Sequence, residues 1–131
     1  MDKKTQGKKN REAGARFERK VRKYFENRGW IVDKFTNNID LEKGCFVPAK
    51  SNRFGSRSCG FPDFVIWKYA GRIDVPVFEV VFVECKVNGY LKPVEREKMG
   101  WLTEGGHKCI VASRGEGFKI KFTELGHDNS S

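Results

Sequence analysis

The residues best suited to chemistry are two acids and a lysine in segments that read as β-strands. Asp63 stands at the start of one apolar segment, and Glu84 and Lys86 stand near the end of a longer one, residues 75–87. Alternate residues of a strand share a face, so both charges follow Phe82 on one side. Charged groups on an apolar strand are costly unless they are paired or bind a ligand. The pattern therefore predicts either a functional site or a buried ion pair.

The two apolar segments predict a β-hairpin that would bring the acids together. Residues 61–69 and 75–87 flank a short stretch that contains the turn residue Gly71. If the strands pair antiparallel, Asp63 and Glu84 converge at one end of the sheet. Two carboxylates near a backbone carbonyl form an oxygen-rich site that suits Mg²⁺ or Mn²⁺.

Such a site has the groups that phosphodiester hydrolysis needs. A metal polarises the phosphate and lowers the pKa of bound water, and a cation such as Lys86 stabilises developing charge. Glu18 adds a third carboxylate if its helix packs across this end of the sheet. Structural alternatives remain: Glu18 paired with Arg22 on the helix surface, and Asp63 and Glu84 as a capped turn and a buried ion pair with Lys86.

Hydrophobic periodicity predicts the elements that position these residues. Apolar residues at helical spacing indicate a helix over residues 11–28, with Asn10 as N-cap and Gly29 as C-cap. The other expected elements are a strand at 30–35, a loop at 36–60, a helix at 93–104, a buried strand at 108–113 and an edge strand at 118–122. The order α-β-β-β-α-β, with an extra edge strand, predicts one α/β domain with a mixed central sheet flanked by helices. We expect this domain at 11–125, after a flexible basic arm (1–10) and before a frayed tail (126–131).

The charge distribution points to a nucleic-acid partner. The 131 residues include 26 Lys+Arg and 17 Asp+Glu, a net charge of +9, and residues 1–23 alone contribute +7. Clustered positive charge is typical of phosphate-backbone binding, although a solvated tail is the alternative. Scattered charges in the 36–60 loop fit either interpretation. The candidate DNA-binding residues are Lys8, Lys9, Arg11, Arg16, Arg53, Arg57, Ser58 and Lys98.

Other classes of protein fit the sequence poorly. The longest nearly apolar run, 75–83, contains a proline and a glutamate and is far shorter than the ~20 residues that a bilayer requires. The charged N-terminus does not resemble a secretory signal. Four cysteines without a CxxC pair suggest reduced thiols in a cytoplasmic protein, including host cytoplasm for a viral protein; zinc at Cys45, Cys59 and His107 is the alternative. We expect neither a membrane partner nor a small-molecule cofactor.

Two sequence patterns resemble a known nuclease group. Pro62-Asp63, a hairpin and then Glu84-Cys85-Lys86 resemble the PD-(D/E)XK nuclease superfamily, and residues 14–21, GARFERKV, resemble the first helix of archaeal-type and viral Holliday junction resolvases. The resemblance spans residues 14–114 and implies a restriction-endonuclease-like fold. It gives Glu18, Asp63 and Glu84 metal-site roles, with the Cys85 carbonyl as a further ligand and Lys86 as the catalytic lysine.

The resemblance also implies an activity. A homodimer would resolve four-way DNA junctions in recombination and repair by Mg²⁺- or Mn²⁺-dependent hydrolysis that leaves 5′-phosphate ends. The alternatives are a related nuclease for flaps, branched DNA or restriction-type targets, and a non-catalytic basic nucleic-acid-binding protein. Two features depart from the resolvase pattern: Asp63 and Glu84 are 21 residues apart, and Lys98 stands where many members have glutamine.

Overall fold

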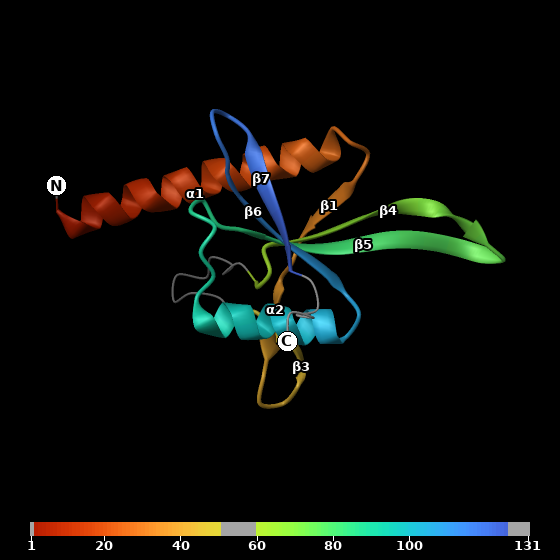
Figure 1. Ribbon diagram of the computed structural model, residues 1–131. Helices are drawn as coiled ribbons and strands as arrows, with labels where there is room; N and C mark the ends of the chain where they lie inside the picture. The colour runs from red at the N-terminus through yellow and green to blue at the C-terminus, as the bar shows by residue number, and fades with distance from the viewer. Residues whose placement is uncertain (1, 51–59, 126–131) are drawn as a thin grey trace.

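A five-stranded mixed sheet separates the two helices of this single α/β domain (Figure 1). The computed structural model describes residues 2–50 and 60–125. The sheet has the order β1-β4-β5-β6-β7, in which only β5 and β6 pair parallel. Its strands are β1 (Ile31–Lys34), β4 (Phe64–Ile73), β5 (Val75–Cys85), β6 (Lys108–Arg114) and β7 (Ile120–Leu125). The predicted α/β class with a mixed sheet is therefore confirmed.

Helix α1 (Lys3–Glu26) covers one face of the sheet. Its buried residues Phe17, Val21 and Phe25 recur at every fourth position, which forms one apolar stripe. This stripe packs against sheet residues that include Ile66 and Val83. Residues 17–25 therefore fix the helix on the sheet, and the preceding turns extend beyond it (Figure 1).

Helix α2 (Pro93–Glu104) covers the opposite face, where Met99 and Leu102 pack with Phe82 and Val111. Proline at the first helical position suits a helix start, because the proline lacks an N–H that would have no helical partner there. The C-cap is Gly105, and the helix has the bounds that the sequence predicts. Because β5 residues alternate between faces, Val81 and Val83 contact the α1 side and Phe82 contacts the α2 side.

The predicted bounds of the first helix are wrong at both ends. Helix α1 begins at Lys3, with Asp2 accepting a hydrogen bond from the Thr5 N–H, so residues 3–10 are helical although the sequence predicts a helix only from residue 11. The expected caps Asn10 and Gly29 are replaced by Asp2 and Asn27. The sequence did not show this because these residues have no large apolar side chain and thus no amphipathic pattern.

A small hairpin stands where the sequence predicts only loop. Strands β2 (Asn37–Asp40) and β3 (Cys45–Pro48) pair antiparallel as a separate two-stranded sheet. The ring of Phe46 lies 5.3 Å from that of Trp101, so the hairpin packs beside α2. Four-residue strands leave too little alternation for detection. The tail at 126–131 lies outside the described residues.

Candidate functional site

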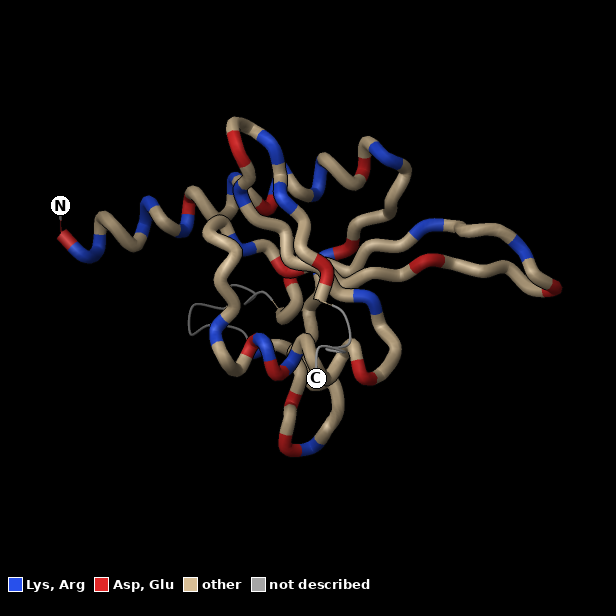
Figure 2. Tube along the Cα trace, viewed as in Figure 1, with Lys and Arg blue, Asp and Glu red and all other residues tan. Residues whose placement is uncertain are grey.

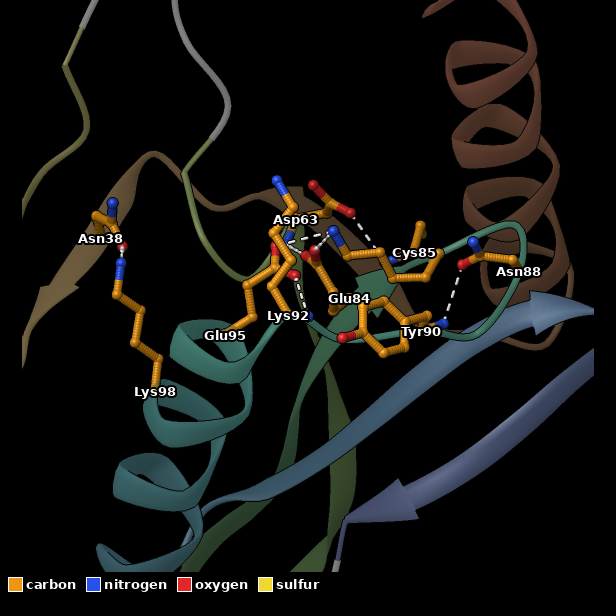
Figure 3. Close-up of polar contacts among 10 residues, drawn as sticks. Asn38, Asp63, Glu84, Cys85, Asn88, Tyr90, Lys92, Glu95 and Lys98 are labelled. Carbon is orange, nitrogen blue, oxygen red and sulfur yellow. Dashed lines mark hydrogen bonds and ion pairs between the residues drawn. The ribbon is translucent and has the colours of Figure 1, made fainter. Parts of the chain in front are cut away.

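Asp63 and Glu84 meet at the base of the β4–β5 hairpin (Figure 3). The Asp63 N–H donates to Glu84 Oε1 at 3.0 Å, and the Cys85 N–H donates to Asp63 Oδ2 at 2.9 Å. Glu84 is buried, with 4% of its surface exposed, and Asp63 is partly buried. The predicted convergence of the two acids is confirmed.

The strand register explains why residues 21 positions apart meet. Phe64 pairs with Val83, so the residues just outside this pair, Asp63 and Glu84, face each other. The register shift lies at Tyr69/Gly71, in the distal half of the hairpin. An extended turn therefore changes the far end of the hairpin and leaves its base unaltered.

Burial raises the pKa values of both acids. The pKa of Glu84 rises to about 9, first through burial and then through the charge and hydrogen bond of Asp63. Burial also raises the pKa of Asp63, although the Cys85 N–H opposes this by stabilising the carboxylate. Two buried like charges cannot both ionise cheaply, so the pair favours a shared proton or a bound cation.

Lys86 lies between two carboxylates just after β5 ends. Its Nζ is 2.8 Å from Glu95 Oε2 and 3.6 Å from Glu84 Oε2. Burial disfavours the charged lysine, but the hydrogen bond to Glu95 and the charges of both acids outweigh this and raise the pKa of Lys86. Lys86 is thus held as a cation beside the acid pair.

Glu95 is a site residue that sequence analysis missed. It is the third residue of α2, and its Oε1 accepts the Lys92 N–H at 2.9 Å while Oε2 binds Lys86. Burial would raise the pKa of Glu95, but these two hydrogen bonds lower it. A proline followed two residues later by glutamate indicates a helix start, and only the packing of α2 brings this glutamate to Lys86.

Glu18 reaches the site from α1, on the other face of the sheet. It is partly buried, and burial, followed by the charge of Asp63, raises its pKa. The pKa of the Cys85 thiol is raised by burial and then by three acids, Asp63, Glu18 and Glu84. Arg22 pairs instead with Glu26 at 3.6 Å. The structure therefore brings Glu18 into electrostatic range of the pair and favours this over the surface-pair alternative.

The donor chemistry of this site fits a hard divalent cation. The candidate ligands are the carboxylates of Asp63, Glu84 and Glu18 and the carbonyl of Cys85, all oxygen donors. In residues 2–50 and 60–125, no group of three or more His, Cys, Asp or Glu side chains is arranged closely enough to hold a metal by itself. Mg²⁺ retains several waters and often binds only one or two protein carboxylates, so two close acids meet its needs.

The predicted DNA-binding residues fall into three groups. Lys8, Lys9, Arg11 and Arg16 are exposed on α1, whose length carries basic residues away from the sheet (Figure 2). Lys98 Nζ binds Asn38 Oδ1 at 3.0 Å, which ties α2 to β2 beside the site (Figure 3). Three further candidates, Arg53, Arg57 and Ser58, lie outside the described residues.

The cysteines give no support for zinc. Cys45 is exposed at the start of β3, and Cys109 is buried, which raises the pKa of its thiol to about 12. Cys59, the other thiol of the zinc alternative, lies outside the described residues. Among the described residues, no cluster of metal-ligand type includes Cys45 or His107.

Comparisons with known proteins add no assignment. The chain matches no family model, no curated protein and no solved structure. In the part of the chain that the structure describes, neither helix combines the length and the apolar character needed to cross a membrane. Arguments about function therefore depend on the site itself.

Proposed function

We propose that this protein is a Mg²⁺- or Mn²⁺-dependent DNA endonuclease that resolves four-way junctions. One observation carries the proposal: Asp63 and Glu84 meet through a 3.0 Å hydrogen bond at a hairpin base, and Lys86 Nζ lies 3.6 Å from Glu84. Acids with raised pKa values beside a fixed cation are typical of functional sites. The resemblance of these residues to the PD-(D/E)XK pattern supplies the reaction class.

Each group has a role in hydrolysis. Asp63, Glu84 and the Cys85 carbonyl would hold the metal, with Glu18 beside them. When bound, the metal would polarise the phosphate and lower the pKa of a bound water. Lys86, held by Glu95 at 2.8 Å, stabilises the charge that develops on the phosphate or orients the attacking water. Cleavage would leave 5′-phosphate and 3′-hydroxyl ends.

The basic surface supports DNA as substrate. Lys8, Lys9, Arg11 and Arg16 are exposed on the same helix that carries Glu18, so backbone binding and the site share one element. Contacts to phosphates position a protein on DNA without reading sequence. Resolution of a junction requires two symmetric cuts, so we propose that two chains act as a homodimer in the cytoplasm.

A cleavage assay on a panel of substrates tests this proposal. End-labelled four-way junction, flap, linear duplex and single strand are each incubated with the protein and Mg²⁺. Paired symmetric nicks confined to the junction are expected. Preferential cutting of flap or duplex would retain the nuclease and reject junction resolution. Binding without cleavage in either Mg²⁺ or Mn²⁺ would indicate a non-catalytic nucleic-acid-binding protein.

A further inference from the structure

A basic pocket lies between α1 and the turn that joins β6 to β7. Its volume is about 460 Å³. The described residues that line it include four cations, Lys20, Lys23, Arg28 and Lys119, and no carboxylate. A pocket with only positive side chains among its charged groups suits an anionic ligand.

The turn presents Phe118 to solvent at the rim of this pocket. The side chain is 93% exposed, although the sequence predicts it within the edge strand, which begins only at Ile120. The Gly115 N–H donates to the Lys119 carbonyl at 2.9 Å, and Gly117 has a φ of 64°, which glycine adopts without strain. A hydrogen bond therefore closes the turn, and the Phe118 ring lies outside the hydrophobic core.

Contacts from α1 fix the turn and the pocket wall. Lys20 Nζ donates to the Phe118 carbonyl and lies 5.9 Å from the centre of its ring. The Arg28 guanidinium stacks on Tyr24 at 3.6 Å, and its Nη1 donates to the Tyr24 carbonyl at 3.1 Å. The pocket thus combines cations that are fixed by hydrogen bonds with the exposed ring of Phe118.

The turn that carries Phe118 lies at the same end of the sheet as the acids. Strands β5 and β6 run parallel with Cys85 beside Ala112, so the turn after β6 follows the sheet end where Asp63 and Glu84 meet. Lys20 follows Glu18 by two residues, which places the two side chains on different sides of α1. Lys20 lines the pocket and Glu18 is near the acids, so the pocket and the acid pair adjoin opposite sides of α1.

We propose that this pocket binds one unpaired nucleotide of a DNA strand, its base stacked on Phe118 and its phosphate held by Lys20, Lys23 and Lys119. Aromatic rings beside cations bind single strands in this way, because every base has a face that can stack. An acidic peptide would form ion pairs with the cations, but its carboxylates would not stack on the exposed Phe118 ring. The choice of DNA as ligand rests on the proposed function.

Binding of oligothymidine to the full chain tests the inference. Fluorescence anisotropy is measured with an oligothymidine of about ten nucleotides, which is within the range of single-strand site sizes. Phe118→Ala should weaken binding by about 5- to 150-fold, and Phe118→Trp should restore it. Lys119→Gln should reduce the slope of log affinity against log salt by about 0.7. Matched controls are Ile73→Ala, 75% exposed at the hairpin tip, and Arg72→Gln, exposed beside it; both should bind as the unmodified protein does.

Two outcomes would overturn the inference. Unchanged affinity in Phe118→Ala would remove the stacking role, and equal binding of a polyglutamate of matched charge would show a non-selective anion surface. These results are separable from the proposed function. If the protein binds oligothymidine through Phe118 but does not cleave the junction, only the proposed nuclease activity is rejected. If it cleaves the junction but binds oligothymidine equally well without Phe118, only the pocket proposal is rejected.

Discussion

Asp63 and Glu84 are joined across the base of one hairpin, where the Asp63 N–H donates to Glu84 Oε1 at 3.0 Å. The pair is balanced on the α2 side by Lys86, which Glu95 holds at 2.8 Å. When both acids are ionised, two carboxylates beside one lysine leave excess negative charge in a largely buried place. The proposed divalent cation would supply the counter-charge.

Metal binding should stabilise the fold. A metal that binds only the folded chain raises the free energy of unfolding by about 1.4 kcal/mol at ten times its dissociation constant. We expect Mg²⁺ or Mn²⁺ to raise the melting temperature of the unmodified protein and of Asp74→Asn. The same ions should leave Asp63→Asn unchanged, because it lacks a ligand. Equal metal-induced shifts in Asp63→Asn and Asp74→Asn would place the metal elsewhere.

Stability in EDTA should fall as the pH rises. Glu84 has a pKa of about 9 in the folded chain against an ordinary value of 4.5. Between these values the folded chain keeps a proton that the unfolded chain releases, so the free energy of unfolding decreases with increasing pH. Denaturant titrations from pH 5 to about 9 should show this decrease.

Glu84→Gln should flatten that pH dependence, because glutamine is neutral throughout. The variant should be more stable than the unmodified protein near pH 8, where the buried acid is costly. Glu79→Gln is the matched control, since Glu79 lies on the same strand but on the opposite face from Glu84. A Glu84→Gln slope equal to that of the control would show that Glu84 does not titrate as described.

Glu95 should act as a positioning residue for Lys86. Lys86→Met should reduce the cleavage rate by about 10²- to 10³-fold, as removal of one group that stabilises developing charge does in other enzymes. Glu95→Gln should have a smaller effect and should move the high-pH limb of the rate profile to lower pH. The reason is that Glu95 helps to raise the pKa of Lys86. Glu97→Gln, exposed on the same helix, should change neither property.

The basic face of α1 should contribute salt-dependent affinity for DNA. Replacement of Lys8 and Lys9 by glutamine should weaken binding to all duplex sequences and reduce the salt slope by about 0.9 for each phosphate that the protein no longer neutralises. Arg72→Gln, exposed at the tip of the β4–β5 hairpin, serves as control. Competition titrations at several salt concentrations measure both the affinity and the slope. An unchanged slope would mean that these lysines do not bind phosphates.

Sequence patterns predicted the part of the site that depends on strand pairing. Alternation placed Glu84 and Lys86 on one face, and the hairpin brought Asp63 to Glu84, because both follow from the two-residue period of a strand. The sequence could not place Glu95, since its contact with Lys86 depends on how α2 packs on the sheet. The angle at which a helix packs on a sheet produces no periodic pattern in the local sequence.

The remaining errors have local causes. Residues 3–10 lack apolar side chains, so their helix has no periodic pattern, and Asp2 rather than Asn10 caps it. The β2–β3 hairpin has four-residue strands, and its support comes from tertiary contacts such as Phe46 with Trp101. Phe118 continued the alternation of the last strand, but a turn stabilised by Gly117 leaves it exposed.

The central claim is that Asp63 and Glu84 form a metal-dependent centre for DNA cleavage. The most direct measurement compares single-turnover cleavage of an end-labelled four-way junction by the unmodified protein, Glu84→Gln and Glu79→Gln, in Mg²⁺ and in EDTA. We predict cleavage in Mg²⁺ by the unmodified protein and by Glu79→Gln, and none by Glu84→Gln or by any of the three in EDTA. Cleavage by Glu84→Gln at the unmodified rate, or cleavage that persists in excess EDTA, would contradict the claim.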